Sequence, residues 1–257
     1  GPGEQKLEMD RRIIKQRITQ LRKELVQVKH TRELTRKKRQ EIPVTLVAIT
    51  GYTNAGKSTL LNKLTGAGVL SENKLFATLD PVTRKYEFEN GGEMLFTDTV
   101  GFIRKLPHHL VQAFRGTLEE AKYADIILHV ADCSNPDMDA QMYTVYETLD
   151  KLCIGDKKII TAFNKIDLED GGTVFKDLRA DKTVMISARN GTGIEELLEV
   201  LKEAAEEGKR VADKTFSYNE AAKVNEIHKI GQIIEEDYRN EGIYIKAQVP
   251  KEYVYMF

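Results

Sequence analysis

The sequence has 257 residues, of which 41% are hydrophobic and 31% are charged, and its formal net charge is −1. This length allows a sizeable core and roughly one to three domains, and the composition is typical of an ordinary soluble globular protein. The longest apolar runs are far shorter than the roughly 20 residues of a membrane-spanning helix, and no signal peptide is visible. The two cysteines, Cys133 and Cys153, have no metal-ligand spacing. We expect both to be buried free thiols in a reducing cytoplasm.

Residues 4–41 contain neither proline nor glycine, and their apolar positions repeat at alternating spacings of four and three. This spacing is typical of the seam of a coiled-coil helix. The chain offers no obvious partner helix, so we expect the partner to lie upstream of Gly1 or on another molecule. The seam consists of Ile14, Ile18, Leu21, Leu25 and Val28.

The same segment is strongly basic. Thirteen Lys and Arg residues against six Asp and Glu residues give it a charge of +7, which leaves −8 for the rest of the chain. Such a run is either the solvated face of a helix or a contact with a phosphate backbone, for which RNA is the expected partner. The cluster Arg36-Lys37-Lys38-Arg39 favours the phosphate contact. No aromatic residue interleaves these charges, so the pattern does not indicate stacking on single-stranded bases.

Residues 43–209 alternate between strand patterns and helix patterns, which predicts an α/β fold with a doubly wound, mostly parallel sheet. Asn90-Gly91-Gly92 predicts a hairpin, which introduces one antiparallel strand. The expected strands are Val44–Thr50, Arg84–Glu89, Glu93–Asp98, Asp125–Ala131, Lys158–Asn164 and Thr183–Ser187. The expected helices are Lys57–Leu64, His109–Ala121, Ala140–Leu152 and Ile194–Glu206.

A phosphate-binding loop follows the first of these strands. Gly51, Gly56, Lys57 and Ser58 form the pattern G-x-x-x-x-G-K-S between an apolar strand and a helix, which is the context that supports a P-loop. The glycines let the backbone wrap tightly, so that N–H groups and the helix N-terminus point at phosphate. Lys57 is expected to reach the β- and γ-phosphates, and the Ser58 hydroxyl to bind Mg²⁺.

Two further motifs end later strands, where ligands bind in such sheets. Asp98-Thr99-Val100-Gly101 is a D-x-x-G, in which the Asp can hold a water on Mg²⁺ and the Gly N–H can meet the γ-phosphate. Asn164-Lys165-Ile166-Asp167 is an N-K-x-D, whose final carboxylate can accept hydrogen bonds from N1–H and the 2-amino group of guanine. Adenine would leave that carboxylate desolvated and unpaired, so the motif favours guanine. Ser187-Ala188-Arg189 is expected to donate backbone N–H groups to the guanine O6.

A segment between the P-loop helix and the hairpin is a candidate switch. It runs from Phe76 to Pro81, and its Thr78 can bind Mg²⁺ and the γ-phosphate, so that the segment orders with triphosphate and relaxes after hydrolysis. Thr83 is the competing candidate, and Thr78 is preferred.

Residues 210–257 change character. A helical pattern over Asn219–Lys229 precedes two alternating segments, Gly231–Asp237 and Gly242–Val249, which are typical of a hairpin turning between them. We expect a small α+β unit, β-α-β-β, and find no chemistry in it. The predicted domains are therefore a helical segment at 1–42, a nucleotide-binding domain at 43–209 and this small domain at 210–257.

Together these motifs resemble the TRAFAC-class GTPases and, within them, the HflX family of the Obg–HflX superfamily. The stretches that carry the resemblance are GPGEQKLEMDRRII, GYTNAGKSTL, FATLDPVTR, TDTVGFIRKLPHHLVQAFRGTLEE, NKIDL and SARNGTGIEEL. The resemblance spans residues 1–209 and is looser over 210–257. HflX proteins carry a further N-terminal domain and a first long helix, so the resemblance implies that this sequence is a fragment.

The resemblance implies a cytoplasmic, Mg²⁺-dependent P-loop GTPase that binds GTP and GDP. It also implies association with the large ribosomal subunit in splitting or rescuing stalled ribosomes, with the basic helix near its RNA, and we expect a monomer. The Mg²⁺ ligands expected are Ser58, Thr78 and Asp98, and the residues expected to act in catalysis are Lys57, Thr78 and Gly101. The nucleotide contacts expected are Gly51, Tyr52, Thr53, Asn54, Ala55, Gly56, Lys57, Ser58, Thr59, Phe76, Ala77, Thr78, Leu79, Asp80, Asp98, Thr99, Val100, Gly101, Asn164, Lys165, Ile166, Asp167, Ser187, Ala188 and Arg189.

Two residues bear on how the site would orient the attacking water and whether it would bind K⁺. Phe102 follows the D-x-x-G motif where Ras-type proteins place a glutamine that orients the attacking water. Phenylalanine cannot do this, so we expect slow intrinsic turnover that a partner accelerates, with Phe102 pointing away from the phosphate. Asn54 lies where several such GTPases help to hold K⁺, and the alternative is that Asn54 only caps the loop.

Three functions remain open at this stage. The first is a GTP-hydrolysing ribosome factor, and the second is a nucleotide-gated RNA-binding module whose turnover is incidental. The third is an adenine-nucleotide P-loop enzyme or kinase, against which N-K-I-D argues. Partner-stimulated hydrolysis separates the first two, because a binding module needs only occupancy.

Overall fold

The computed structural model describes residues 8–24, 26–27, 44–66, 82–89, 92–103, 120–169 and 172–257. The chain divides into two compact units, Gly1–Pro43 and Val44–Phe257. Several predicted features lie outside the described residues: Leu25 and Val28 of the seam, the cluster 36–39, the candidate switch 76–81, the turn residues 90–91 and most of the helix expected at His109–Ala121. None of the described helices is long and apolar enough to cross a membrane.

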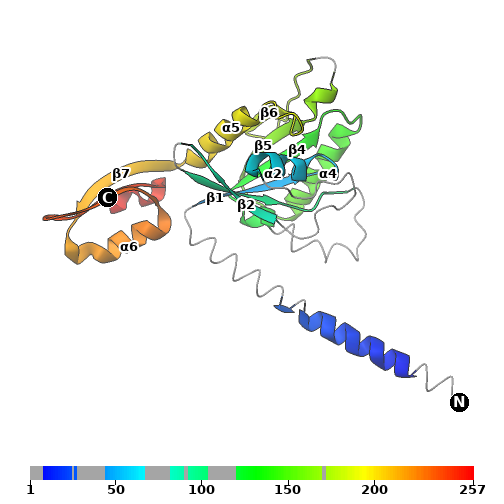
Figure 1. Cartoon of the computed structure of the whole chain (residues 1–257), viewed down its shortest axis with the longest axis horizontal. Helices are drawn as coiled ribbons and strands as arrows, with labels where there is room; N and C mark the ends of the chain where they lie inside the picture. The colour runs from blue at the N-terminus through cyan, green and yellow to red at the C-terminus, as the bar shows by residue number, and fades with distance from the viewer. Residues whose placement is uncertain are drawn as a thin grey trace. The chain divides into compact units, whose positions relative to one another are not determined.

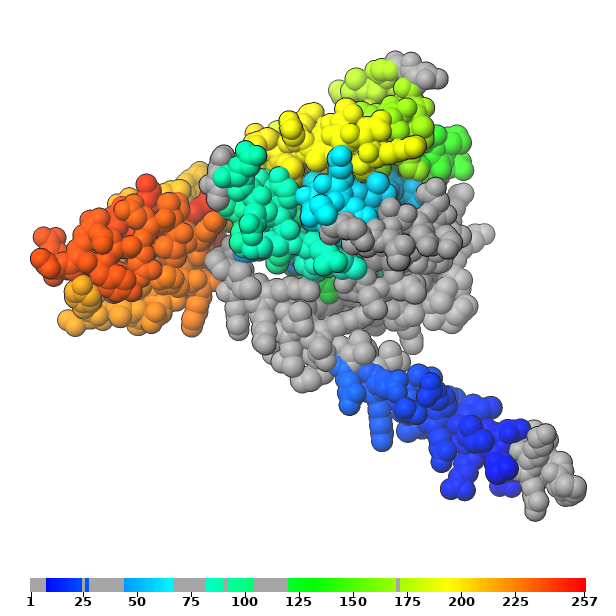
Figure 2. Space-filling model, viewed as in Figure 1, coloured from blue at the N-terminus to red at the C-terminus, as the bar shows by residue number. Residues whose placement is uncertain are grey.

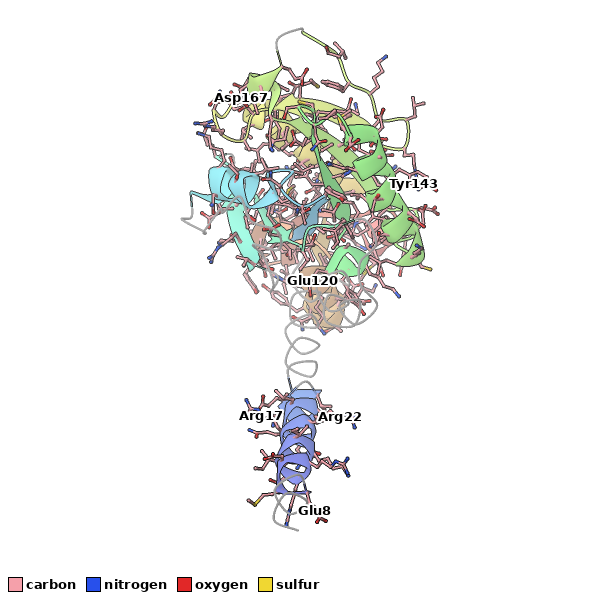
Figure 3. All side chains as sticks on the ribbon, turned by 90° about the vertical axis from the view of Figure 1, so that its right-hand side faces the viewer. Glu8, Arg17, Arg22, Glu120, Tyr143 and Asp167 are labelled. Atoms are coloured by element: carbon pink, nitrogen blue, oxygen red, sulfur yellow. The ribbon has the colours of Figure 1, made fainter. Side chains whose placement is uncertain are left out.

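The described part of the first unit is a helix over residues 8–24, which continues at 26–27. The seam residues Ile14, Ile18 and Leu21 are 58%, 44% and 44% exposed. Figure 3 shows the side chains of Arg17 and Arg22 projecting from the same helix. The predicted helix is therefore confirmed over the described residues, and it presents both its apolar seam and its basic side chains on the surface of that unit.

A six-stranded sheet forms the centre of the second unit, in the order β2-β3-β1-β4-β5-β6. Its neighbouring strands are parallel except for the antiparallel pair β2 and β3. The strands are β1 (Thr45–Gly51), β2 (Val82–Glu87), β3 (Glu93–Asp98), β4 (Ile126–Asp132), β5 (Lys158–Asn164) and β6 (Lys182–Ile186). The predicted doubly wound α/β fold is thus confirmed, including its antiparallel strand.

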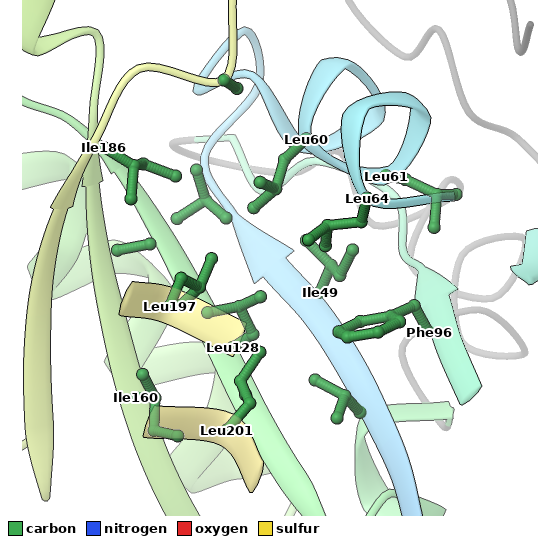
Figure 4. Packing of buried hydrophobic residues seen from close by; sticks show 14 of the residues in the cluster. Ile49, Leu60, Leu61, Leu64, Phe96, Leu128, Ile160, Ile186, Leu197 and Leu201 are labelled. Atoms are coloured by element: carbon green, nitrogen blue, oxygen red, sulfur yellow. The ribbon is translucent and has the colours of Figure 1, made fainter. Parts of the chain in front are cut away.

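One face of the sheet is covered by α2 (Lys57–Thr65) and α5 (Ile194–Glu206), which lie side by side in Figures 1 and 2. Their leucines pack onto the strands in one apolar cluster, with Leu60 and Leu197 fully buried against β-strand residues such as Ile49 and Leu128 (Figure 4). Central strands of this kind are buried on both faces, which is why β1 and β4 read as continuous apolar runs.

The opposite face is covered by α4 (Met138–Lys151). Val145, Tyr146 and Leu149 of this helix are buried in a second cluster together with Ala48 and Ile127 of the sheet. Their spacing of one, three and four residues places them on one stripe of the helix. Because the helices occupy both faces, the carboxyl ends of the parallel strands are left as the edge where loops can gather.

The C-terminal part is a three-stranded antiparallel sheet in the order β7-β9-β8, with α6 packed on it. Its elements are β7 (Lys209–Phe216), α6 (Ala221–Ile230), β8 (Gln232–Arg239) and β9 (Gly242–Pro250), with short 3₁₀ turns at η2 (Tyr218–Glu220) and η3 (Lys251–Met256). Its core contains Phe216, Ile227 and Ile245, which are fully buried. The β-α-β-β prediction is confirmed.

The prediction for the cysteines was half wrong. Cys133 is a buried free thiol at the end of β4, whereas Cys153 is free but exposed. Cys153 follows the last turn of α4 with a positive φ of 51°. The helix was expected to run to Leu152, directly before Cys153, but it ends at Lys151, and Cys153 lies exposed in the turn that follows.

Candidate nucleotide-binding site

The predicted P-loop links β1 to α2 at the carboxyl edge of the sheet. Gly51 ends β1 with a φ of 153°, and a Cβ there would lie 2.3 Å from the Val130 carbonyl oxygen of β4. Gly56 precedes α2 with a φ of 99°, and its Cβ would lie 2.2 Å from the Asn164 side chain. Only glycine fits at these two points, because the chain combines a positive φ at Gly56 with a close approach of neighbouring groups at both.

Lys57 begins α2 and turns back over this loop. Its ammonium donates a hydrogen bond to the Tyr52 carbonyl oxygen at 2.9 Å, and the residue is only 7% exposed. Burial lowers the pKa of Lys57 from 10.5 to about 8, although the nearby Asp98 carboxylate opposes this shift. A buried cation with so little compensation is poised to gain from an anion placed beside it.

Ser58 and Asp98 come together although they lie 40 positions apart in the sequence. The Ser58 hydroxyl donates to Asp98 Oδ2 at 2.7 Å, and Asp98 is buried at the end of β3. A hydroxyl and a carboxylate are oxygen donors of the kind that Mg²⁺ takes, usually with one or two protein ligands beside phosphate and water. The described residues contain no cluster of three His, Cys, Asp or Glu side chains that could hold a metal alone. Their donor set therefore fits a metal that is completed by phosphate.

Gly101 and Phe102 follow the D-x-x-G strand and lie against the P-loop. The Phe102 N–H donates to the Gly51 carbonyl at 3.0 Å, and the Thr53 N–H donates to the Phe102 carbonyl at 2.9 Å. A Cβ on Gly101 would lie 2.7 Å from Thr53 Cγ2 and 3.0 Å from Lys57 Nζ. The Phe102 side chain is 5% exposed and belongs to the apolar cluster on the α4 side of the sheet.

Asn164 ties three loops together. Its side-chain amide donates to the Ala55 carbonyl in the P-loop at 2.8 Å and accepts from the Ala188 N–H at 2.9 Å. The end of β5 is thereby joined to the phosphate loop on one side and to the loop after β6 on the other. Two motifs predicted separately, N-K-I-D and S-A-R, are in this way part of one structure with the P-loop.

Asp167 lies in the short turn η1 (Ile166–Leu168) and is exposed. Figure 3 shows it at the edge of the second unit, among the loops that follow the strands. The Ser187 hydroxyl donates to Asp167 Oδ1 at 2.6 Å and accepts from the Asn190 N–H at 3.1 Å. One carboxylate oxygen is thus held in place while the group stays accessible, and Arg189, two residues after Ser187, is exposed as well.

The remaining predicted residues divide by whether the structure describes them. Tyr52, Thr53, Asn54, Ala55 and Thr59 lie in the P-loop or the first turn of α2, Thr99 and Val100 follow β3, and Ile166 begins η1. Phe76, Ala77, Thr78, Leu79 and Asp80 lie outside the described residues. Thr83, the competitor of Thr78, lies in β2 within 2.8 Å of the Thr97 hydroxyl. Asn54 is exposed and has a φ of 63°.

The sequence analysis missed the polar turn after β4. Asp132 forms an ion pair with Lys165 of N-K-I-D, with Oδ2 and Nζ 2.6 Å apart. Cys133 donates to the Asn164 carbonyl oxygen through both its N–H and its thiol, each at 3.0 Å. The place of these residues in the chain could have indicated a role at the site. Asp132, Cys133 and Ser134 stand at the carboxyl end of a strand that lies between the P-loop strand and the N-K-I-D strand.

Comparison with known families and structures agrees with this geometry. Residues 46–165 match the family described as "50S ribosome-binding GTPase", and residues 1–39 match the "GTP-binding GTPase Middle Region". A GTP-binding protein from Sulfolobus solfataricus in complex with GDP aligns with a TM-score of 0.53 at 27% identity, over 75% of this chain and 58% of that one. Era in complex with MgGDPNP and nucleotides of 16S ribosomal RNA aligns with a TM-score of 0.52 at 26% identity, over 63% and 57%. The fold and the site thus define a P-loop protein of the GTPase type.

Curated relatives narrow this class to one family. GTPase HflX of Lacrimispora saccharolytica is 56% identical over 252 residues, which cover 98% of this chain and 60% of the relative. GTPase HflX of Escherichia coli is 41% identical over 206 residues, which cover 79% and 48%. The chain belongs to the HflX family of GTPases. It spans about 60% or less of the length of these curated relatives.

Proposed function

We propose that the chain binds GTP and GDP with Mg²⁺ and hydrolyses GTP. The observation that carries this proposal is Asn164, which joins the phosphate loop at Ala55 to the loop of Ala188. One residue thereby sets the distance between a phosphate cradle and a carboxylate suited to guanine. A guanine nucleotide must have its base and its phosphates held at the same time, so a fixed link between these two loops supports the proposal.

The phosphate end depends on Lys57, Ser58 and Asp98. The Ser58 hydroxyl, and the Asp98 carboxylate directly or through water, would hold Mg²⁺, which would supply positive charge against the β- and γ-phosphates. Lys57 supplies a buried cation beside them, and the backbone of Gly56 and the start of α2 supply N–H groups. A Cβ on Gly101 would lie 3.0 Å from Lys57 Nζ, and this closeness supports the proposal that the Gly101 N–H meets the γ-phosphate. Thr78 is the proposed switch ligand.

The base end depends on Asp167, which we propose accepts the N1–H and 2-amino hydrogens of guanine. The exposed carboxylate and its bond from Ser187 support this role. The Arg189 N–H group is the proposed donor to the guanine O6; the Ala188 N–H, which was expected to share this role, donates to Asn164 Oδ1 instead. Adenine lacks the matching donors and would leave the carboxylate unpaired, which is the physical basis for selecting GTP over ATP.

The residue after D-x-x-G offers no side chain that could orient the attacking water. The Phe102 side chain is packed in the core cluster of the α4 face, so the residue after D-x-x-G contributes no polar group. Intrinsic hydrolysis should therefore be slow and should rise when a partner orders the site. Asn54, exposed at the rim of the P-loop, is the proposed site of stimulation by K⁺; equal rates in K⁺ and Na⁺ would refute that part.

The proposed partner is the large ribosomal subunit, in splitting or rescue of ribosomes in the cytoplasm. The matched family description names 50S binding, and the helical segment 4–41 carries a charge of +7 that suits ribosomal RNA. We propose that this segment forms one domain (1–42), with the GTP-binding domain at 43–209 and a small domain at 210–257, in a chain that acts as a monomer.

GTP hydrolysis by this chain, with and without purified large ribosomal subunits at two salt concentrations, tests the proposal. Stimulation that is lost at high salt is expected, because counterion release makes contacts with RNA salt-dependent. A variant with Arg17 and Arg22 changed to Ala should keep the basal rate and lose part of the stimulation. Unchanged rates with subunits at low salt would contradict the ribosome assignment.

One observation favours a second candidate. The buried Phe102 is also consistent with a nucleotide-gated RNA-binding module in which turnover is incidental. In that case GTP should strengthen binding to large subunits as much as a non-hydrolysable analogue does, and the subunits should leave the hydrolysis rate unchanged.

A further inference from the structure

Asp132 ends β4, the strand that lies next to the strand leading into the guanine motif. In the parallel pairing of β4 with β5, Asp132 is the register partner of Asn164, the last residue of β5. The turn after β4 therefore lies beside the backbone that carries Lys165 and Asp167. We propose that Asp132 is a positioning residue for guanine selection, which acts by holding Lys165 in the conformation that aims Asp167 at the base. This inference rests on the proposed guanine-nucleotide site.

The two oxygens of Asp132 have separate tasks. Oδ2 pairs with Lys165 Nζ at 2.6 Å, whereas Oδ1 accepts from the Ser134 N–H at 3.2 Å and from the Ser134 hydroxyl at 2.7 Å. The bonds from Ser134 therefore orient the carboxylate, and its second oxygen is left to pair with Lys165. The side chains of Asp132 and Lys165 are 9% and 25% exposed, so the pair is partly shielded from water. Salt screens a partly buried ion pair of this kind much less than an exposed one.

The backbone of Lys165 needs this support. Lys165 has a φ of 72° and a ψ of 31°. This is a left-handed backbone conformation that residues other than glycine, asparagine and aspartate seldom adopt. Strained positions of this kind persist only when surrounding contacts determine them, and they gather at functional sites. Two contacts act here from the same turn: Asp132 holds the Lys165 side chain, and Cys133 holds the carbonyl of the preceding Asn164.

The thiol of Cys133 is a dependable donor in this arrangement. Burial, together with the negative charges of Glu169 and Asp132, raises its pKa from 9.0 to about 11. The thiol therefore stays protonated at neutral pH, and its hydrogen can bond to the Asn164 carbonyl. The turn thus fixes the peptide link between Asn164 and Lys165 from one side.

The conformation of Lys165 sets the orientation of Asp167, and through it the contact with the base. Lys165 is the residue from which η1 starts, and η1 carries Asp167. When Lys165 keeps its left-handed conformation, Asp167 faces the Ser187 hydroxyl and the open rim of the site. If Asp132 released Lys165, the turn could relax toward a right-handed conformation and rotate Asp167 away from the base. The phosphate loop would be unaffected, because Asn164 holds it independently.

The test compares Asp132→Asn with a matched control. Asp132→Asn keeps the size and the bonds to Ser134 but removes the charge that holds Lys165. The control is Asp150→Asn, which removes the exposed ion pair between Asp150 and Arg179, 2.7 Å apart and on the surface. Dissociation constants for GDP and for ADP, measured with Mg²⁺, report selectivity, and the thermal unfolding temperature reports the fold.

Asp132→Asn should weaken GDP binding about tenfold while ADP binding stays within about twofold, so that the GDP-to-ADP selectivity falls about tenfold. The variant Lys165→Met should show the same loss, and the double variant should lose no more than either single one. Asp150→Asn and the wild type should share one selectivity.

Three results would overturn the inference: unchanged selectivity in Asp132→Asn, equal weakening of GDP and ADP, or losses that add in the double variant. Equal weakening accompanied by a lower unfolding temperature would mean that Asp132 has only a structural role. A wild-type chain that fails to prefer GDP over ADP would instead refute the guanine site itself, so the two failures are distinguishable.

Discussion

The titration of Lys57 offers a quantitative prediction about nucleotide binding. Burial lowers the pKa of this lysine to about 8 in the nucleotide-free protein. Bound phosphates would bring negative charge to its ammonium and raise that pKa well above the neutral range. Only the charged lysine pairs with phosphate, so binding must take up a proton wherever the free protein has lost it. The affinity for GDP should therefore fall as the pH rises through 8.

The size of this effect follows from the pKa. With a pKa of about 8, about nine tenths of the Lys57 side chains are charged at pH 7 and about one tenth at pH 9, so the dissociation constant should rise about tenfold between these pH values. Calorimetry at pH 8 in two buffers with different heats of ionisation should show an uptake of about half a proton per GDP bound.

The control is Lys57→Arg, because arginine stays charged throughout this range. The guanine base itself loses its N1 proton in alkali, and this loss affects wild type and variant alike. The difference between their pH profiles therefore reports Lys57 alone. Parallel profiles, or a change of less than about twofold that is specific to the wild type, would refute the reasoning from burial.

Three further predictions follow from the same structure. Lys57→Met removes a buried cation, so the nucleotide-free protein should gain about 1–3 kcal/mol of unfolding free energy at pH 7, measured with urea; a loss would contradict this. Gly101→Ala adds a Cβ 2.7 Å from Thr53 Cγ2, so GTP hydrolysis should fall about tenfold or more, and a normal rate would refute the close contact. Burial lowers the pKa of His129 despite the nearby Asp177, so the unfolded chain binds the extra proton and stability should fall by about 1 kcal/mol between pH 7.5 and 5.5. His129→Leu should lack this component, and equal pH dependence would count against it.

The elements that were easiest to predict are those whose ends are marked by a clear change in residue type. β3 and β5 begin and end where predicted, at Glu93–Asp98 and Lys158–Asn164, because charged or turn-forming residues flank apolar runs. α4 begins at Met138 rather than the expected Ala140. The Asn135 side chain accepts from the Asp137 N–H at 2.9 Å and forms a turn that leads directly into the helix.

The site shows a similar division. Motifs with a fixed local spacing, such as the P-loop and N-K-I-D, can be recognised along the chain because a few neighbouring residues carry their chemistry. The pair of Asp132 with Lys165 could not be recognised in this way. It depends on the register that sets Asp132 opposite Asn164, and a shift of one residue would turn the carboxylate to the other face of the sheet. Single polar residues at strand ends become informative only once the strand order is known.

The packing of Phe102 was predicted from a chemical argument rather than from a motif. Phenylalanine cannot orient a water molecule, so it was expected to point away from phosphate, and its side chain is indeed 5% exposed in the cluster on the α4 face. The exposure of Cys153 was missed because helix ends are uncertain by one or two residues, and here that uncertainty decides burial.

The most direct test of the guanine-nucleotide site is the affinity of this chain for GDP and ADP in Mg²⁺, measured by calorimetry under identical conditions. The account predicts that GDP binds at least about a hundredfold more tightly, because ADP would leave the Asp167 carboxylate without its partners. It also predicts that Asp167→Ala removes most of this preference. Equal affinities for the two nucleotides in the wild-type chain would contradict the assignment of the site.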